Sequence, residues 1–411
     1  MANAQTVAMQ AIETVNGTIT TPKGFKSDGI HTKVKRKRND LGVIYCDQPV
    51  AAAAVYTLNQ IQAAPIAVTK EAIQTNGKIQ AVVVNSGHAN ACTGKQGLID
   101  AYDVQEKVAK TFVIQPEDIA VASTGLIGER MKMEKIIPGI EQLEPVANEQ
   151  GAEAFAQAIL TTDTFTKSAC VQTVIDGEVV TVAGVAKGSG MIHPNMATML
   201  GFMTTDANIS HEALQHVLSN VTDQTYNRIT VDGDTSTNDM VLALASAEVD
   251  HEELNEAHPE WLQFVSAMQA VSESLSKQIA RDGEGATKLI EVQVSGAPTD
   301  ADAGKIAKQI VGSDLVKTAI YGTDANWGRI ICAIGYAGVT IDPDTIDIAI
   351  GSYDTLLNSE PVMFSEEEVL AYLKGEEITI HVHLHVGEGV GKAWGCDLTY
   401  DYVRINAGYR T

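Results

Sequence analysis

Short apolar runs rich in Val, Ile and Tyr alternate with segments of helical periodicity along this chain. In the N-terminal half, Leu41 to Thr57 and Gln80 to Asn85 are predicted as buried strands. Asp100 to Phe112 and Ala147 to Leu160 carry apolar residues at helical spacing. Because strands and helices need different periods, the alternation favours an α/β or α+β enzyme over a helical bundle or a β-sandwich.

The C-terminal half repeats this alternation. Helices are predicted at His211–Asn220, Pro259–Arg281, Ala303–Val311 and Glu366–Leu373. Strands are predicted at Lys288–Val294, Lys317–Ile320, Ile346–Ile350 and Glu377–Val386. Ser365, with Glu368 three residues later, forms a capping box that marks the start of the last helix. The segment Ser295–Gly304 is rich in Asp, Ala, Gly and Pro, and we interpret it as a linker.

Composition and charge exclude several classes of protein. The 411 residues are 45% hydrophobic and 20% charged, which is typical of a globular protein with a sizeable core. Asp and Glu outnumber Lys and Arg by 52 to 29, and the formal charge is −23. Such a surface repels nucleic-acid phosphates and anionic lipids, so no nucleic-acid or membrane partner is expected.

The compartment is predicted from the N-terminus and the cysteines. Met1 to Gly24 has no basic region followed by an apolar stretch, so no secretory signal is visible. The longest apolar run, Ile330 to Thr340, is far shorter than the roughly 18 residues that a membrane helix needs. The five cysteines are scattered, as expected for reduced thiols. We therefore expect a cytoplasmic protein.

Two clusters suggest binding sites but have simpler interpretations. Lys33–Arg38 holds five basic residues in six, and we interpret it as a solvated edge strand rather than a nucleic-acid patch. His381, His383 and His385 alternate along a predicted strand and would share one face. No acidic or cysteine ligand stands at a suitable spacing, so no metal site is predicted.

The segment from Lys187 to Leu200 (KGSGMIHPNMATML) is the most informative stretch. Its glycines permit a tight turn, and Pro194 restrains the approach to the Ala197–Thr198 bond. A threonine hydroxyl that attacks the preceding carbonyl forms an ester, whose hydrolysis frees the threonine α-amine. With a reference pKa of about 7.7–8.0, this amine can act as the base for its own hydroxyl. From this segment alone, a Gly-rich turn entering the apolar strand Met199–Met203 remains the preferred interpretation.

Further motifs change that interpretation. They are Val84–Gly94 (VNSGHANACTG), Ser123–Gly128 (STGLIG), Thr161–Thr164 (TTDT), Val231–Asp239 (VDGDTSTND), Arg281–Lys288 (RDGEGATK), Gly322–Arg329 (GTDANWGR) and Trp394–Ala407 (WGCDLTYDYVRINA). In this order, they resemble the ornithine acetyltransferase family of arginine biosynthesis over essentially the whole chain. The family is often called bifunctional, because some members also make N-acetylglutamate from acetyl-CoA. His88 departs from the asparagine expected in many members, which affects no catalytic residue.

The resemblance implies an αββα-type sandwich of the α/β (α+β) class, shared with self-processing aminopeptidases and distinct from a Rossmann fold. It also implies autocatalytic cleavage between Ala197 and Thr198. The resulting α chain (1–197) and β chain (198–411) are expected to stay interleaved in one catalytic unit. Two such units are expected to form a heterotetramer.

The implied reaction moves the acetyl group of N2-acetylornithine to glutamate, through an acetyl ester on the nucleophile Thr198. Thr124 and Gly125 are expected to form the oxyanion site, since a hydroxyl and a backbone N–H are suitable donors. Lys187 suits a substrate carboxylate, and Glu284 suits the side-chain ammonium of ornithine. The substrate-binding residues implied by the resemblance are Thr161, Lys187, Thr198, Glu284, Asn406 and Thr411.

No cofactor is implied, and the sequence leaves open whether acetyl-CoA is a second donor. That activity would make the glutamate N-acetyltransferase an amino-acid N-acetyltransferase as well. One alternative is a self-processed N-terminal-nucleophile aminopeptidase or amidase on the same fold, which passes the acyl group to water. Another is a non-catalytic amino-acid-binding protein, which would keep its chain intact.

Overall fold

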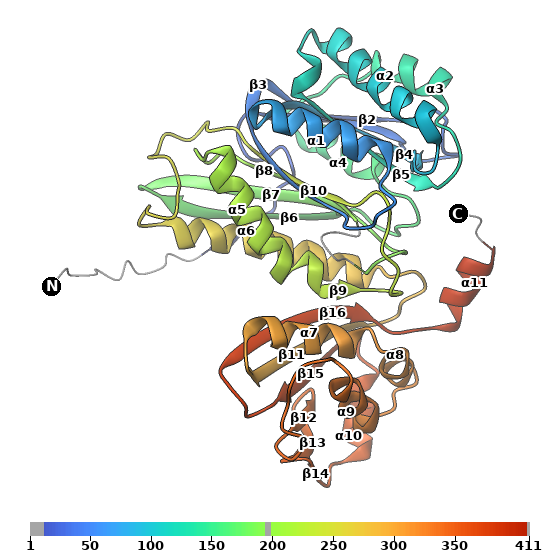
Figure 1. The fold of residues 1–411 in the computed structure, drawn as a ribbon, viewed down its shortest axis with the longest axis vertical. Helices are drawn as coiled ribbons and strands as arrows, with labels where there is room; N and C mark the ends of the chain where they lie inside the picture. The colour runs from blue at the N-terminus through green and yellow to red at the C-terminus, as the bar shows by residue number, and fades with distance from the viewer. Residues whose placement is uncertain (1–11, 194–198, 409–411) are drawn as a thin grey trace, which may run out of the picture.

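The computed structural model describes residues 12–193 and 199–408, which form two β-sheets and their covering helices (Figure 1). In this part of the chain the first sheet has the strand order β1-β6-β7-β8-β10-β3-β4-β5, with β2 beside β3. Its strands are β1 (Glu13–Thr14), β2 (Phe25–Ile30), β3 (Leu41–Tyr56), β4 (Lys78–His88), β5 (Ile119–Leu126), β6 (Lys167–Ile175), β7 (Glu178–Lys187), β8 (Leu200–Thr205) and β10 (Met240–Ala245). The three strands predicted in this region, at 41–57, 80–85 and 199–203, are confirmed as β3, β4 and β8.

Strand β3 connects two layers of this sheet. Its first half pairs with β2 and β4, its second half pairs with β10, and its register against β4 shifts between Tyr45 and Val50. Alternate residues of β4 and β8, such as Val82 and Phe202, belong to one shared apolar core. Since successive side chains of a strand point to opposite faces, the two layers pack against each other through this core.

Helices cover the outer faces of both layers. Helices α5 (His211–Gln224) and α6 (Trp261–Arg281) pack on the layer of β6, β7, β8 and β10, whereas α2 (Gly94–Phe112) and α3 (Met133–Ile140) pack on the other. Helices α1 (Ala64–Asn76) and α4 (Glu149–Ala158) add side chains to the shared core. This order confirms the αββα-type arrangement. The antiparallel pairs β7–β8 and β3–β10 distinguish it from the mainly parallel Rossmann fold.

The second sheet lies on the other side of α6, in the lower part of Figure 1. Its described strands run in the order β14-β13-β12-β15-β11-β16-β9. They are β9 (Ile229–Thr230), β11 (Leu289–Ala297), β12 (Asp347–Ile350), β13 (Tyr353–Leu357), β14 (Glu360–Pro361), β15 (Glu377–His383) and β16 (Gly389–Cys396). The remaining helices are α7 (Asp300–Val311), α8 (Asp314–Tyr321), α9 (Trp327–Gly335), α10 (Glu366–Leu373) and α11 (Tyr400–Gly408).

Most predicted elements are confirmed, and two in the C-terminal half of the chain are wrong. The predicted strand Lys317–Ile320 belongs to α8, because Ser313 caps a helix whose buried residues Val316, Ala319 and Ile320 recur at helical spacing. The predicted linker Ser295–Gly304 is mostly β11 and α7. Thr299 accepts a hydrogen bond from the Asp302 N–H and so starts α7 directly after β11. By contrast, Ser365 caps α10 as predicted.

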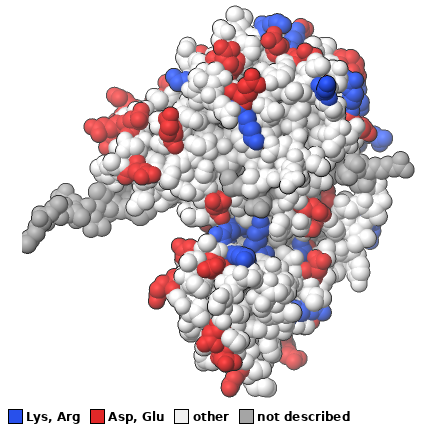
Figure 2. Space-filling model, in the orientation of Figure 1, with Lys and Arg blue, Asp and Glu red and all other residues white. Residues whose placement is uncertain are grey.

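The predicted cleavage products share one sheet, because β8 and β10 lie between β7 and β3. Figure 2 shows acidic and basic side chains interspersed over one face; one group of Lys and Arg lies where the upper and lower parts of the molecule meet, and others lie near the top. None of the helices in the described ranges is both long and apolar enough to cross a membrane.

Candidate active site

A cavity of about 170 Å³ lies at the ends of β5 and β7 and the start of β8. Six residues predicted from the sequence line it: Thr124, Gly125, Thr161, Lys187, Glu284 and Asn406. The fold therefore brings together five segments that are far apart in the sequence. Ala197, Thr198 and Thr411 lie outside the described residues. The description resumes at Met199, which itself lines the cavity.

Thr124 and Gly125 form the end of β5 at this cavity. The Thr124 hydroxyl accepts a hydrogen bond from Lys187 Nζ at 3.2 Å, so its own O–H remains available as a donor. Gly125 has a φ of +133°, and a Cβ there would lie 2.2 Å from the carbonyl carbon of Gly87. Only glycine fits this position, which keeps the backbone open to a bound molecule.

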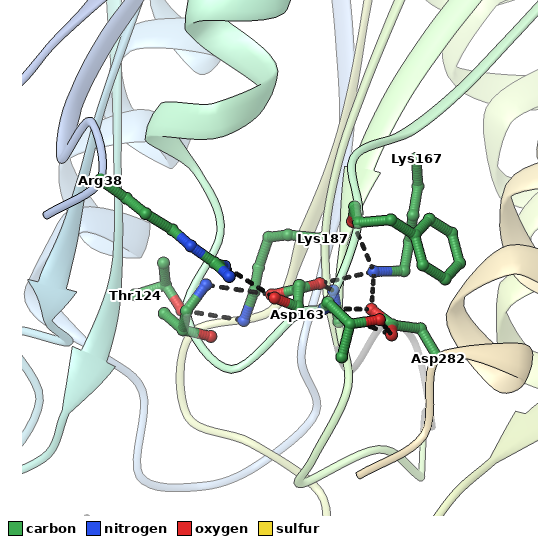
Figure 3. Close-up of polar contacts among 10 residues, drawn as sticks. Arg38, Thr124, Asp163, Lys167, Lys187 and Asp282 are labelled. Carbon is green, nitrogen blue, oxygen red and sulfur yellow. Dashed lines mark hydrogen bonds and ion pairs between the residues drawn. The ribbon is translucent and has the colours of Figure 1, made fainter. Parts of the chain in front are cut away.

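A buried network of charges holds the opposite wall, as Figure 3 shows. One oxygen of Asp163 accepts from Lys167 Nζ and from the Gly188 N–H, both at 2.7 Å, and the other accepts from the Thr161 N–H at 3.0 Å. Burial alone would raise the pKa of Asp163, but Lys167, Lys187 and these hydrogen bonds lower it below its usual value. Asp163 therefore stays ionised and fixes both Thr161 and the Gly188 turn.

Lys187 and Lys167 are the buried cations of this network. Burial lowers the pKa of Lys187, whereas Asp163, and Asp239 when it is ionised, oppose that shift. Lys167 is fully buried and also contacts Asp282 at 2.5 Å. Lys187 thus brings positive charge into the cavity, whereas Lys167 forms ion pairs with Asp163 and Asp282.

The Gly-rich segment before the predicted cleavage bond is held by side chains from distant segments. Asp232 accepts hydrogen bonds from the N–H groups of Met191, at 2.7 Å, and Ile192, at 2.8 Å. Gly190 leaves room for Glu284, since a Cβ at this position would lie 2.5 Å from the Glu284 carboxylate. The segment's glycines therefore serve close packing around the cavity as well as a turn.

Glu284 and Asn406 form the outer part of the cavity wall. Asn406 lies on α11 and donates from Nδ2 to Glu284 Oε2 at 2.9 Å. Glu284 is itself fixed by its N–H, which donates to the Ser189 carbonyl at 3.0 Å. The last described helix thus contributes Asn406 and Tyr402 to the cavity wall.

The basic segment Lys33–Arg38 differs from its prediction. It forms a bent loop between β2 and β3, not an edge strand, and two of its cations point inward. Lys35 Nζ donates to the Leu160 carbonyl at 2.8 Å, and Arg38 donates to the Asp163 carbonyl at 2.7 Å (Figure 3). Burial lowers the pKa of Lys35 to about 8. Since these bonds flank Thr161, the loop positions a predicted binding residue.

Several cavity residues were not assigned roles from the sequence. The clearest are Asp232 and Asp239, which line the cavity and belong to the motif VDGDTSTND. Asp163 of the motif TTDT is not in the lining but accepts a hydrogen bond from the lining residue Thr161. The sequence signal that could have identified these residues was the run of acidic residues beside glycine and threonine. It could not tell which carboxylates hold the backbone and which face the cavity.

Two residues of the predicted histidine cluster, His381 and His383, line a second cavity of about 840 Å³, between α5, α6 and the second sheet. His383 accepts or donates a hydrogen bond with Ser295, while His385 lies beyond β15 and contacts Asp347 at 2.7 Å. Sequence spacing gave no hint of Asp347, which lies in β12. Among residues 12–193 and 199–408, no group of three His, Cys, Asp or Glu side chains is arranged to hold a metal ion.

Comparison with known proteins gives consistent matches over the whole chain. The model of the ArgJ family matches residues 26–411. The arginine biosynthesis bifunctional protein ArgJ of Shouchella clausii (strain KSM-K16) is 63% identical over 403 residues, which cover 98% of each chain. A crystal structure of the protein of the same name from Bacillus halodurans is 66% identical with a TM-score of 0.50. It covers 51% of this chain and 98% of the solved chain. A solved ornithine acetyltransferase from Mycobacterium tuberculosis, complexed with ornithine, is 35% identical with a TM-score of 0.43, covering 46% of this chain and 100% of that one.

Proposed function

Because this chain belongs to the ArgJ family, the bifunctional acetyltransferases of arginine biosynthesis, we propose that it transfers the acetyl group of N2-acetylornithine to glutamate. The products are ornithine and N-acetylglutamate. The cavity itself is the observation that supports this proposal. Its wall contains the opposite charges of Lys187 and Glu284, together with Thr124 and Gly125. Met199, the residue that follows Thr198, lines the same cavity.

Self-cleavage prepares the enzyme in this proposal. The Thr198 hydroxyl attacks the carbonyl carbon of Ala197, the peptide C–N bond breaks, and an ester forms. Water then hydrolyses the ester and leaves a carboxylate on Ala197 and a free α-amine on Thr198. A cut before Thr198 divides the chain near its middle, and the solved chain from Bacillus halodurans likewise corresponds to 51% of this one.

Acetyl transfer follows in two half-reactions. Thr198 Oγ attacks the acetyl carbonyl of N2-acetylornithine, and ornithine leaves from an acetyl-Thr198 ester. The α-amine of glutamate then attacks the ester and restores the hydroxyl. The proposed donors to the oxyanion are the Thr124 O–H and the Gly125 backbone N–H. The Thr124 oxygen accepts from Lys187, which leaves its O–H available to donate. One such donor typically contributes about 10²–10³ in rate.

Opposite charges in the cavity wall support recognition of an amino acid. We assign the substrate carboxylate to Lys187 and the ornithine ammonium to Glu284, with Thr161 and Asn406 as hydrogen-bonding neighbours. Thr411 is proposed to complete the site from the end of the chain. Acetyl-CoA is proposed as an additional donor, in line with the bifunctional name of the relatives.

The two cleavage products stay together in this proposal as one α–β unit, and two units form a heterotetramer. Support for the interleaving comes from β8 and β10, which lie between strands of the proposed α chain. All five cysteines are unpaired, as is usual in a reducing compartment, so we place the enzyme in the cytoplasm.

The acetyl-enzyme tests the proposed function. Incubating the cleaved protein with N2-acetylornithine and no glutamate should add one acetyl group, located at Thr198 by peptide mass spectrometry. Adding glutamate should remove the group and yield N-acetylglutamate, with parallel double-reciprocal plots. Release of free acetate at the same rate without glutamate would identify an amidase instead. Intersecting plots with no acetylated chain would contradict the covalent route.

Glu284→Gln tests the assigned donor specificity. Gln keeps the side-chain shape but removes the charge that pairs with the ornithine ammonium. A charge-assisted hydrogen bond is worth roughly 1.5–3 kcal/mol, so kcat/KM for N2-acetylornithine should fall about 10- to 150-fold. An activated acetyl ester without an ammonium should lose far less. Equal losses with both donors would assign Glu284 to the fold or the chemistry.

A further inference from the structure

Asp239 is a buried carboxyl group in the cavity wall that has no role in the proposed mechanism, and Ser236 forms hydrogen bonds with it. The Asp239 side chain lines the cavity, and the residue is only 3% exposed. Its Oδ2 atom forms no hydrogen bond with any described residue. Buried polar atoms nearly always have a partner, so an unpartnered oxygen beside a substrate cavity needs an explanation.

The strand register places Asp239 next to the start of β8. In this part of the sheet, β8 lies between β7 and β10, and Lys187 and Met240 are the partners of Leu200 on either side. The Met240 N–H donates to the Met199 carbonyl at 3.0 Å. Asp239 directly precedes β10 and therefore lies beside the first described residue after the proposed nucleophile.

The other ionisable groups of the cavity wall have different surroundings. Asp232 accepts two backbone N–H groups, and Glu284 is bonded to Asn406. Asp234, Tyr402 and Lys187 complete the ionisable lining among the described residues. Hydrogen bonds from Ser236 and the charge of Lys187 stabilise the Asp239 carboxylate. Burial is the larger effect, and it raises the pKa of Asp239 well above its usual value.

The proposed reaction requires storage of one proton. Ornithine is released by amide cleavage as a neutral amine and leaves the site as an ammonium ion. Glutamate arrives with its α-amine protonated and can attack the ester only after losing that proton. The first half-reaction therefore consumes a proton, and the second returns one.

We propose that Asp239 holds this proton and passes it between the cavity and the two substrate amines. The inference rests on the proposed function. In the first half-reaction, Thr198 gives its hydroxyl proton to the leaving nitrogen, and the neutral Asp239 carboxyl then protonates the ornithine amine and becomes a carboxylate. In the second, this carboxylate takes a proton from the glutamate ammonium. The neutral amine attacks the ester, its remaining extra proton returns to Thr198 Oγ, and Asp239 is again protonated.

Asp239→Asn removes the proton carrier and keeps the size of the side chain. The N2-acetylornithine and glutamate reaction should slow by about 10²-fold or more, the usual contribution of a general acid or base. A p-nitrophenyl acetate and hydroxylamine reaction should stay within about threefold of wild type. Its phenolate leaves without protonation, and hydroxylamine is already neutral near pH 7. Equal losses with both substrate pairs would overturn the proposal.

Asp232→Asn is the matched control, because this carboxylate lines the same cavity but holds the backbone of Met191 and Ile192. It should slow both substrate pairs by similar factors. The variants also separate this inference from the proposed function. If p-nitrophenyl acetate acetylates the Asp239→Asn variant at Thr198, the nucleophile is intact, and a slow reaction with the natural substrates reflects the missing proton carrier. Absence of acetyl-Thr198 in the wild type would instead contradict the proposed function.

Infrared difference spectra test the wild type directly, even if the variant folds poorly. Formation of the acetyl-enzyme from N2-acetylornithine should remove the C=O band of one protonated carboxyl group. Formation from p-nitrophenyl acetate should leave that band in place, since no amine needs the proton. The proposal would be contradicted if the band stayed with both donors, or if it disappeared with both. Either result would mean that Asp239 does not hold a proton for the substrate amine.

Discussion

Thr198→Ala is expected to remain one chain of 411 residues and to lose acetyl transfer by about 10⁴-fold or more. Without the hydroxyl, no ester can form at the Ala197 carbonyl, so the α-amine of residue 198 is never released. The same change removes the atom that would carry the acetyl group. A single substitution thus abolishes both processing and catalysis.

Intact mass spectrometry and N-terminal sequencing measure this outcome. The wild type should give two chains, the second beginning at Thr198, and Thr198→Ser should still be cut because serine keeps a hydroxyl. Thr75→Ala is a suitable control, since Thr75 is exposed on α1 and its hydroxyl donates to the Glu71 carbonyl of the same helix. Cleavage of Thr198→Ala at the same bond, or a wild type that stays intact for days, would contradict self-processing.

Local patterns were sufficient to predict most elements of the fold. Ser365 and Glu368 mark α10, and the apolar periodicity of Pro259–Arg281 predicts α6 almost to its ends. Such signals depend on residues a few positions apart, which is the range over which caps and periodicity act. The strand predicted at Lys317–Ile320 was wrong although local signals for a helix were present, since Ser313 caps α8 and its buried residues recur at helical spacing.

The candidate site was predicted by residue but not by geometry. The motifs identified Thr124, Lys187 and Glu284, and the fold brings them to one cavity. The roles of Asp163 and Arg38 arise from contacts that span 25 residues, from Asp163 to Gly188, and 125 residues, from Arg38 to Asp163, which no spacing rule encodes. From its sequence, a basic run such as Lys33–Arg38 is predicted to be exposed. In the structure, Lys35 and Arg38 instead donate hydrogen bonds to backbone carbonyls of a distant loop.

Lys167→Met should destabilise the folded protein by about 3–5 kcal/mol, because it leaves two buried carboxylates without their shared cation. Lys167 contacts Asp163 at 2.7 Å and Asp282 at 2.5 Å, and its side chain is fully buried. The free energy of unfolding from urea titration measures the change. Lys26→Met is the matched control, since its bridge to Asp47 is exposed and should contribute less than about 1 kcal/mol.

Acidification should reduce this difference between wild type and Lys167→Met. In the folded wild type, the pKa of Asp163 lies below its ordinary value of about 3.9, so its ionisation stabilises the fold above that pH. The stabilisation is lost as pH falls through the lowered folded value. Without Lys167, a protonated Asp163 no longer needs a cation, so the variant should recover relative stability between neutral pH and about pH 4. Adding Asp163→Asn to Lys167→Met should restore part of the stability at neutral pH. A loss that is equal at all pH values, or no larger than that of Lys26→Met, would mean that the network contributes packing rather than charge.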